Sequence, residues 1–228
     1  MMSAALEQIP LDLGNRTALG RQDFLVAPCN QDAVAWIDLW PEWPAPCLVL
    51  YGPVASGKTH IGAVWSEKTA AICVRASDIN ENAIRDIASM DHHVIIEDAD
   101  ELIGNIQGEK GLFHLYNIFK EDGRSFLITL LEPPVRRSFS LPDLASRLRA
   151  APSVAIREPD EQLLGAVLVK LFSDKQIRVG ADALHYILPR IERSFEAVRD
   201  LVEKADSRAM IEKRKISIPL LRDILNQE

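Results

Sequence analysis

Two kinds of apolar pattern alternate along the first two thirds of the chain. Short runs of consecutive apolar residues predict buried strands, and apolar residues that recur every three or four positions predict helices. The predicted strands cover residues 47–51, 70–74, 94–96, 126–131 and 154–156. The predicted helices cover residues 31–40, about 60–68, 80–88 and a segment around 112–119. Since strands and helices alternate, we expect an α/β domain built on a parallel sheet.

The pattern changes near residue 158, after which only helical spacing is found. Helices are predicted over residues 160–174, 180–188, 194–210 and 216–226. The chain therefore divides into an N-terminal tail (1–19), an α/β base domain (20–157) and a small all-α domain (158–228). Among the helix caps, Asn30 is expected before the helix at 31–40, and Ser77 or Asp78 before the helix at 80–88.

Composition limits the classes of function. The 228 residues carry a net charge of −7, so we expect no general attraction to nucleic acid or to an anionic membrane. Three widely spaced cysteines fit no disulfide or metal-binding pattern, which favours a reducing cytoplasm. No apolar run approaches the length of a membrane span, and the first residues lack the basic and apolar regions of a secretory signal. We therefore expect a cytoplasmic protein.

The strand at 47–51 leads into a glycine-rich loop. The loop reads G-x-x-x-x-G-K-[ST] and lies between a strand and a helix, the setting in which this motif binds nucleotide phosphates. Glycines let backbone N–H groups turn toward phosphate oxygens, and the helix N-terminus favours negative charge. Lys58 is expected to reach the β- and γ-phosphates, and the Thr59 hydroxyl to ligate Mg²⁺. The alternative is a chance glycine turn. The loop residues expected to bind ADP or ATP are Gly52, Pro53, Val54, Ala55, Ser56, Gly57, Lys58, Thr59 and His60.

Acidic residues close the strand at 94–96. Glu97 and Asp98 follow three apolar residues at the carboxyl end of this strand, which is where ligands bind in open α/β sheets. Such a carboxylate can hold Mg²⁺ or its water, so Glu97 and Asp98 join Thr59 as expected metal ligands, and Asp98 also joins the nucleotide site. Asp100 and Glu101 follow and leave the assignment within this stretch open. The alternative is a strand that ends in a solvated acidic turn.

The tail contains a short segment with its own pattern, Gln8-Ile9-Pro10-Leu11-Asp12-Leu13. In an extended segment, Leu11 and Leu13 face the same side. Two interpretations follow from the residues alone. The segment packs on its own domain, or it is a linear peptide whose apolar side chains enter a pocket of another protein. The second interpretation assigns the contact to Gln8, Ile9, Leu11 and Leu13.

The order of these segments resembles the AAA+ ATPases and, within them, the nucleotide-binding core of the DnaA family. The resemblance covers residues 20–226. It rests on Phe24-Leu25-Val26 with Asn30, on Gly52 to Thr59, on Asp143-Leu144-Ala145-Ser146-Arg147-Leu148, on Arg157-Glu158-Pro159-Asp160 and on the terminal helices. A DnaA core without its flanking domains resembles the Hda-type regulators of DnaA. The resemblance implies an AAA+ parallel-sheet base domain followed by an all-α lid.

The resemblance to Hda-type regulators also implies partners and a mechanism. The segment Gln8 to Leu13 is similar to the peptide with which these proteins bind the β sliding clamp of bacterial DNA polymerase III. The clamp would recruit the chain to DnaA that carries ATP. Arg147, or as second candidate Arg149, would then act in trans as an arginine finger on the charge that develops in phosphoryl transfer. The alternative for Arg147 is an ion pair that holds the base domain to the lid.

Three positions depart from the DnaA pattern. They are Leu131 in place of the first-sensor aspartate, Leu164 in place of an interface arginine and Glu196 in place of the lid arginine. Thr129 is the polar residue nearest to the first, while Arg193 and Arg199, each three residues from Glu196, would substitute for the lid arginine only in a rotated lid. We therefore expect slow ATP hydrolysis by the chain alone and ADP binding at least as tight as ATP binding.

Two other functions stay open at this point. An autonomous AAA+ ATPase of DNA replication, acting as a loader or motor, would require intact sensor residues and an assembling ring. A DNA-binding adaptor would require the basic domain of DnaA, and the negative charge of the chain disfavours it. We expect no sequence-specific DNA binding, and whether the chain forms a homo-oligomer is left open.

Overall fold

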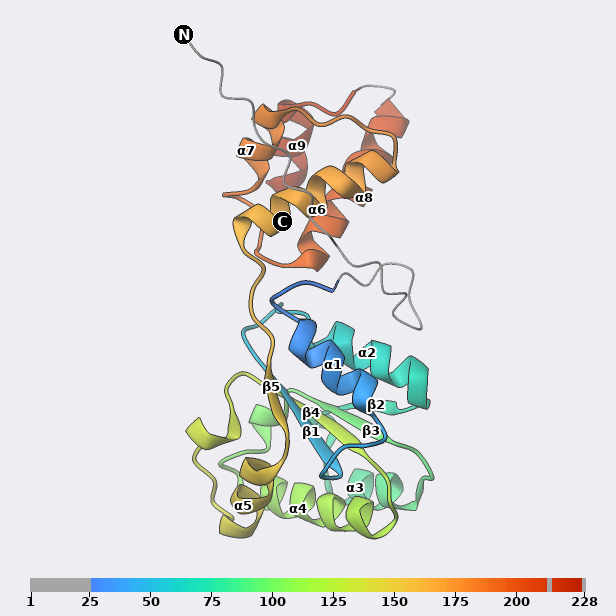
Figure 1. The fold of residues 1–228 in the computed structure, drawn as a ribbon, viewed down its shortest axis with the longest axis vertical. Coiled ribbons are helices and arrows are strands. Elements are labelled where there is room, and N and C mark those ends of the chain that lie inside the picture. Colours follow the sequence, from blue (N-terminus) through green and yellow to red (C-terminus); the bar gives the residue numbers. More distant parts are fainter. Residues whose placement is uncertain (1–25, 213–214, 227–228) are drawn as a thin grey trace.

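The computed structural model describes residues 26–212 and 215–226. A five-stranded parallel sheet with the order β2-β3-β4-β1-β5 fills the lower part of Figure 1. The strands are β1 (Cys47–Tyr51), β2 (Ile72–Arg75), β3 (Val94–Glu97), β4 (Phe126–Leu130) and β5 (Ser153–Ala155). Because β3, β4 and β1 are neighbours and parallel, the loops that follow them meet at one edge of the sheet.

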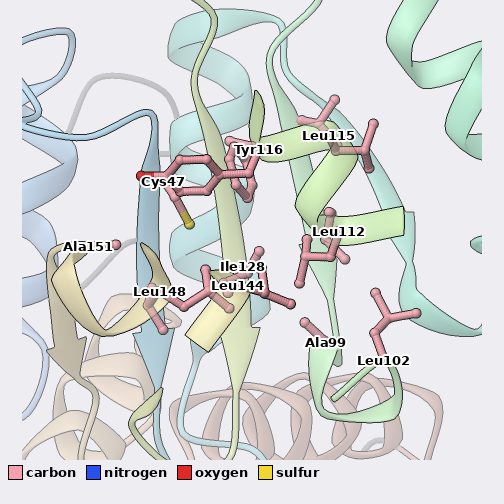
Figure 2. Close-up of a cluster of buried hydrophobic side chains, with 14 of the residues drawn as sticks. Cys47, Ala99, Leu102, Leu112, Leu115, Tyr116, Ile128, Leu144, Leu148 and Ala151 are labelled. Atoms are coloured by element: carbon pink, nitrogen blue, oxygen red, sulfur yellow. The ribbon is translucent and has the colours of Figure 1, made fainter. Parts of the chain in front are cut away.

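Helices cover both faces of the sheet (Figure 1). Alternate residues of β1 point to opposite faces: Leu48 and Leu50 pack with α1 (Gln31–Leu39) and α2 (Lys58–Thr69). On the other face lie α3 (Glu81–Ser89), α4 (Ile106–Glu121) and α5 (Pro142–Ala150). Figure 2 shows this second cluster, in which sheet residues meet side chains of α4 and α5, among them Cys47, Ile128, Leu112, Leu115, Leu144 and Leu148. Short 3₁₀ turns complete this part, η1 (Ala76–Asp78), η2 (Ala99–Glu101) and η3 (Pro134–Arg136).

The C-terminal helices have a hydrophobic core of their own. The helices are α6 (Glu161–Asp174), α7 (Ala181–Ile187), α8 (Phe195–Glu212) and α9 (Ile218–Leu225). Leu168, Phe172 and Leu221 are fully buried in this core. The segment before α1 joins it, because Ala27 packs there and the Cys29 carbonyl accepts a hydrogen bond from the Arg157 N–H at 3.0 Å. Residues 27–29, which precede α1, therefore contact the C-terminal helices and the segment that leads to them.

The predicted fold class, a parallel-sheet α/β part followed by a small helical part, is confirmed. Of the two predicted caps, one is confirmed in position and the other is wrong. Asn30 is the N-cap residue of α1, but its Oδ1 accepts from the Ala27 N–H at 2.8 Å and makes no capping hydrogen bond to the helix. Asn80, not Ser77 or Asp78, caps α3 by accepting from the N–H groups of its second and third residues. Within the described ranges, no helix combines the length and apolarity that crossing a bilayer needs.

A buried carboxylate fixes the connection that leads into α5. Glu109, in the first turn of α4, is completely buried. Its Oε1 accepts from the Gly104 N–H at 2.7 Å and the Ser140 N–H at 3.0 Å, and its Oε2 accepts from the Leu141 N–H at 2.6 Å. The Glu109 carboxylate thus accepts hydrogen bonds from the segment before α4 and from the segment before α5. Three such bonds satisfy a buried carboxylate well.

Glu109→Gln is expected to destabilise the fold by about 2–3 kcal/mol, because an amide group facing the backbone donors leaves at least one N–H without an acceptor. For a chain of this size that corresponds to a fall of the thermal midpoint by roughly 4–10 °C. Glu101→Gln, at an exposed carboxylate nearby, is the matched control and should change stability by less than about 0.5 kcal/mol. Equal midpoints for the two variants would remove this role from Glu109.

Candidate functional site

The loop from Gly52 to Thr59 connects β1 to α2 at the carboxyl edge of the sheet. A Cβ on Gly52 would lie 2.1 Å from the Ile156 carbonyl oxygen, so only glycine fits there. Ala55 and Gly57 adopt left-handed backbone conformations, with φ of 58° and 97°. For the alanine this conformation costs free energy, as is common where a loop is shaped for a ligand.

The same loop presents hydrogen-bond donors without acceptors. α2 begins at Lys58, so the N–H groups of its first turn have no acceptor within the helix. The Ser56 hydroxyl is buried, and the structure gives its Oγ no hydrogen-bond partner. Unsatisfied donors at a helix N-terminus form an anion-binding site. The residues present therefore fit a phosphate group.

Lys58 lies folded back over this loop. Its Nζ donates hydrogen bonds to the Gly52 carbonyl at 2.8 Å and the Pro53 carbonyl at 2.6 Å. Burial lowers the pKa of Lys58, and the negative charges of Asp98 and Asp100 oppose that shift. An ammonium group held by two neutral carbonyls gains a stronger partner when a phosphate anion enters the loop.

Two of the four acidic residues at the end of β3 form hydrogen bonds with β4 or with the residue that follows it. Asp98 is exposed and left-handed (φ 55°), and its N–H donates to the Thr129 Oγ1 at 2.9 Å. Asp100 accepts from the Leu131 N–H through Oδ2 at 2.8 Å. Both carboxylates affect the pKa of Lys58, so they lie on the side of the phosphate loop.

Glu97 has a different neighbour. The pKa of the Cys73 thiol is raised to about 11, chiefly by burial and then by the charge of Glu97 and a hydrogen bond to its carboxylate. The Glu97 side chain is therefore directed to β2. In the described part of the chain, no group of three or more His, Cys, Asp or Glu side chains could hold a metal. Mg²⁺ commonly uses one or two protein oxygens besides water and phosphate, so Thr59 and Asp98 fit an ion that arrives with a nucleotide.

Both candidate arginines lie on α5. The Arg147 Nη1 donates to the Asn117 Oδ1, and its guanidinium carbon lies 4.2 Å from the Phe113 ring centre and 5.3 Å from that of Tyr116. These three partners belong to α4. Arg149 is exposed, and its Nη2 donates to the Arg137 carbonyl at 3.4 Å.

The three positions that depart from the DnaA pattern differ in exposure. Leu164 is buried in the core of the C-terminal helices, while the Leu131 side chain is 46% exposed. Glu196 is exposed in the first turn of α8; Arg193, just before that helix, is also exposed and Arg199 is half-buried. Leu131 and Leu164 carry no charge, so they cannot supply the charges of the aspartate and the arginine that the DnaA pattern has at these positions.

Gly52→Ala is expected to destabilise the fold by about 3 kcal/mol, because the added methyl group would meet a backbone oxygen that cannot move alone. The Ile156 N–H donates to the Tyr51 carbonyl at 2.7 Å, so displacing this segment also disturbs the β1–β5 pairing. Gly180→Ala is the control, since a Cβ there meets nothing within 4 Å. Chemical unfolding of both variants tests the prediction, which equal losses would contradict.

Several residues of this region were not singled out from the sequence. They are Asp100 as the acceptor of the Leu131 N–H, Arg137 as its ion-pair partner and Glu109 as the anchor of α5. Only Glu109 carried a signal, a carboxylate at helical spacing from the apolar Leu112. The predicted peptide contact (Gln8, Ile9, Leu11 and Leu13) lies outside the described residues.

Comparison with known proteins gives three findings. The model of the family "Hda, lid domain" matches residues 161–225. An uncharacterized protein of Haemophilus influenzae is 24% identical over 190 residues, which cover 79% of this chain and 82% of that protein. Domain III of the Thermotoga maritima replication initiation protein DnaA superposes with a TM-score of 0.71 at 18% identity, covering 90% of this chain and 94% of that domain.

A further similar structure contains a bound nucleotide analogue. AMPPCP-bound DnaA from Aquifex aeolicus has a TM-score of 0.65 and 17% identity, and the match covers 79% of this chain and 62% of that protein. At these identities, the structures establish the fold, and the family model adds the lid. The chain therefore has a fold similar to that of DnaA domain III, and its residues 161–225 match the Hda lid domain.

Proposed function

We propose that this chain is a nucleotide-binding regulator of DNA replication initiation that stimulates hydrolysis of the ATP bound to DnaA. The observation that carries the proposal is the combination of an Hda lid domain with a complete phosphate-binding loop in a DnaA-like fold. The nucleotide would be ADP or ATP, since the similar DnaA structure holds the adenine nucleotide analogue AMPPCP. The chain acts in the bacterial cytoplasm, where DnaA is found.

In this proposal the phosphates bind the first turn of α2, and Lys58 turns from its carbonyl partners to the β- and γ-phosphates. A bound Mg²⁺ would neutralise phosphate charge, with Thr59 and Asp98 as its protein ligands. Thr129 holds the Asp98 backbone and thereby the turn on which that carboxylate lies. The turn that carries Asp98 is thus held at the sheet edge, whereas Lys58 changes partners when a phosphate binds.

Hydrolysis of the chain's own nucleotide is slow in this account. An aspartate, which could orient the attacking water, is replaced by Leu131, and a carboxylate replaces a cation at Glu196. A negative charge near the γ-phosphate repels it instead of stabilising the charge of the transition state. Nucleotide binding then serves to set the conformation, and ADP binds at least as well as ATP.

The chemical contribution is made to the partner. Arg147 would stabilise the charge that develops on the γ-phosphate of ATP in DnaA, with Arg149 as the second candidate. Stacking on Phe113 and Tyr116 restricts the rotamers of Arg147, so less side-chain entropy is lost when it meets a phosphate. The DNA-loaded sliding clamp supplies the location through Gln8, Ile9, Leu11 and Leu13.

Clamp binding is tested by a pull-down with purified β sliding clamp. Gln8→Ala combined with Leu11→Ala should weaken capture by at least roughly 30-fold, as expected when anchor side chains of a short peptide are truncated. Glu7→Ala, one position before the peptide, is the matched control and should bind as the wild type does. Capture of the double variant at the wild-type level would exclude this peptide as the clamp contact.

An autonomous ATPase is the second candidate, and the intact phosphate loop is the observation in its favour. It predicts rapid ATP turnover by the chain alone, abolished by Lys58→Ala. Steady-state turnover measured without DnaA and clamp separates the two functions. Slow turnover with tight ADP binding agrees with the regulator.

A further inference from the structure

An ion pair joins the acidic turn after β3 to the segment that leads into α5. The Arg137 Nη2 lies 3.3 Å from the Asp100 Oδ1 and also 3.5 Å from the Asp100 carbonyl oxygen. The other carboxylate oxygen of Asp100 accepts from the Leu131 N–H at 2.8 Å. Asp100 therefore contacts both ends of the loop 131–137, which connects β4 to the segment before α5.

One end of this connection lies at the phosphate loop. The charge of Asp100 is close enough to Lys58 to raise the pKa of that lysine against the effect of burial. When Lys58 changes partner from the carbonyls of Gly52 and Pro53 to a phosphate, the field at Asp100 changes with it. Asp100 is thus placed to respond to an anion in the loop.

The other end of the connection lies on the helix with the candidate arginines. The Arg137 carbonyl accepts from the Arg149 Nη2 at 3.4 Å, and the Arg149 guanidinium lies 5.7 Å from the Phe139 ring centre. Glu109 fixes the backbone of Ser140 and Leu141 through one hydrogen bond to each N–H. Arg137 is therefore joined to α5 in two ways, through Arg149 and through the segment that Glu109 holds at the start of the helix.

The two carboxylates that hold this segment differ in how fully they are satisfied. Glu109 has short hydrogen bonds on both oxygens. By contrast, the Asp100 Oδ1 is buried and lies 3.3 Å from the Arg137 Nη2, but it accepts no hydrogen bond. The Arg137 Nε is also buried and has no acceptor. Unsatisfied buried polar atoms favour a second arrangement in which they find partners. Within this connection, the Asp100–Arg137 pair is the part that would gain hydrogen bonds by rearranging.

We propose that Arg137 is a positioning residue that, paired with Asp100, transmits the state of the phosphate loop to the arginines of α5. This inference rests on the proposed function, since it explains how the chain's own nucleotide regulates its action on DnaA. By linkage, a nucleotide that favours one arrangement of α5 strengthens DnaA binding in that arrangement, and DnaA strengthens nucleotide binding by the same factor.

The test uses a fluorescent probe on α5 in the full chain. Ser146→Cys, at an exposed α5 position, is labelled in a background with Cys29→Ser and Cys73→Ser, since Cys47 is buried and cannot react. ADP and AMPPCP, each with Mg²⁺, are titrated into this protein and into its Arg137→Gln, Arg137→Lys and Arg136→Gln forms. Arg136→Gln removes the same charge from an exposed neighbour and serves as the matched control. Nucleotide affinity is measured in parallel by calorimetry. The affinity for DnaA is measured with and without nucleotide.

In the labelled protein that keeps Arg137, which serves as the wild type here, nucleotide addition should change the fluorescence of the probe. This protein should also bind DnaA at least about 5-fold more tightly with its preferred nucleotide than without nucleotide, within the usual range of coupling. Arg137→Gln should retain nucleotide affinity within about 2-fold but lose the probe response and the nucleotide dependence of DnaA binding, a loss that Arg137→Lys partly restores. An Arg137→Gln response equal to wild type, or an equal loss in Arg136→Gln, overturns the role of Arg137 alone. No nucleotide binding by the wild type overturns the proposed function and this inference with it.

Discussion

Arg147→Ala is expected to reduce the clamp-dependent hydrolysis of DnaA-bound ATP by at least about 10³-fold, the lower end of what an arginine supplied in trans contributes to phosphoryl transfer. The chain's own nucleotide affinity should not change, because Arg147 contacts α4 and not the phosphate loop. Single-turnover release of phosphate from DnaA loaded with ATP measures the effect.

The variant also loses the packing of the guanidinium on Phe113 and Tyr116, which costs roughly 1–2 kcal/mol of stability. Arg147→Lys controls for charge, since it keeps a cation but not the planar fork that matches phosphate oxygens. Arg149→Ala tests the second candidate at an exposed position of the same helix. If Arg147→Ala stimulates like the wild type while Arg149→Ala does not, the finger is Arg149.

Lys58→Ala is expected to weaken ADP and ATP binding by about 10- to 150-fold, since a hydrogen bond to a charged group contributes about 1.5–3 kcal/mol. Lys58 is buried in the loop, and its Nζ donates to the Gly52 and Pro53 carbonyls. Calorimetric titration of both nucleotides measures the change. Because the lysine loses two carbonyl contacts but few apolar ones, the variant should remain folded.

Lys120→Ala, in the last turn of α4 on the far side of the sheet, removes the same charge away from the loop. Its nucleotide affinity should equal that of the wild type. If Lys58→Ala binds ADP as the wild type does, the phosphate loop is not the nucleotide site. Equal weakening in both variants would attribute the effect to net charge.

The strands and most helices follow from the sequence, because buried parallel strands and amphipathic helices leave unmistakable apolar patterns. The run 126–130 and the repeat from Leu112 to Phe119 are examples. The strand at 70–74 begins later than predicted, at Ile72, because Ala70 ends α2 in a left-handed conformation. Such a choice depends on how the helix meets the sheet, which local residues do not determine.

The candidate site divides in the same way. The phosphate loop is readable because its chemistry is local: Gly52, Lys58 and Thr59 act within eight consecutive positions. The partners of Asp100 and Glu109 are not readable, since Leu131, Arg137 and Ser140 lie about thirty residues away in the chain. Glu97 and Asp98 are adjacent in sequence but have different partners. Glu97 ends β3 and is hydrogen-bonded to Cys73, whereas Asp98 lies beyond the strand in a left-handed turn whose N–H donates to Thr129.

We expect this chain to promote hydrolysis at a partner's nucleotide and not at its own. The most direct measurement is release of phosphate from DnaA preloaded with ATP, in the presence of sliding clamp on DNA, with and without this chain. We predict that the chain accelerates release strongly, that omission of the clamp removes most of the acceleration, and that the chain alone turns ATP over slowly. Unchanged release from DnaA in the complete mixture, together with rapid turnover by the chain alone, would contradict the account.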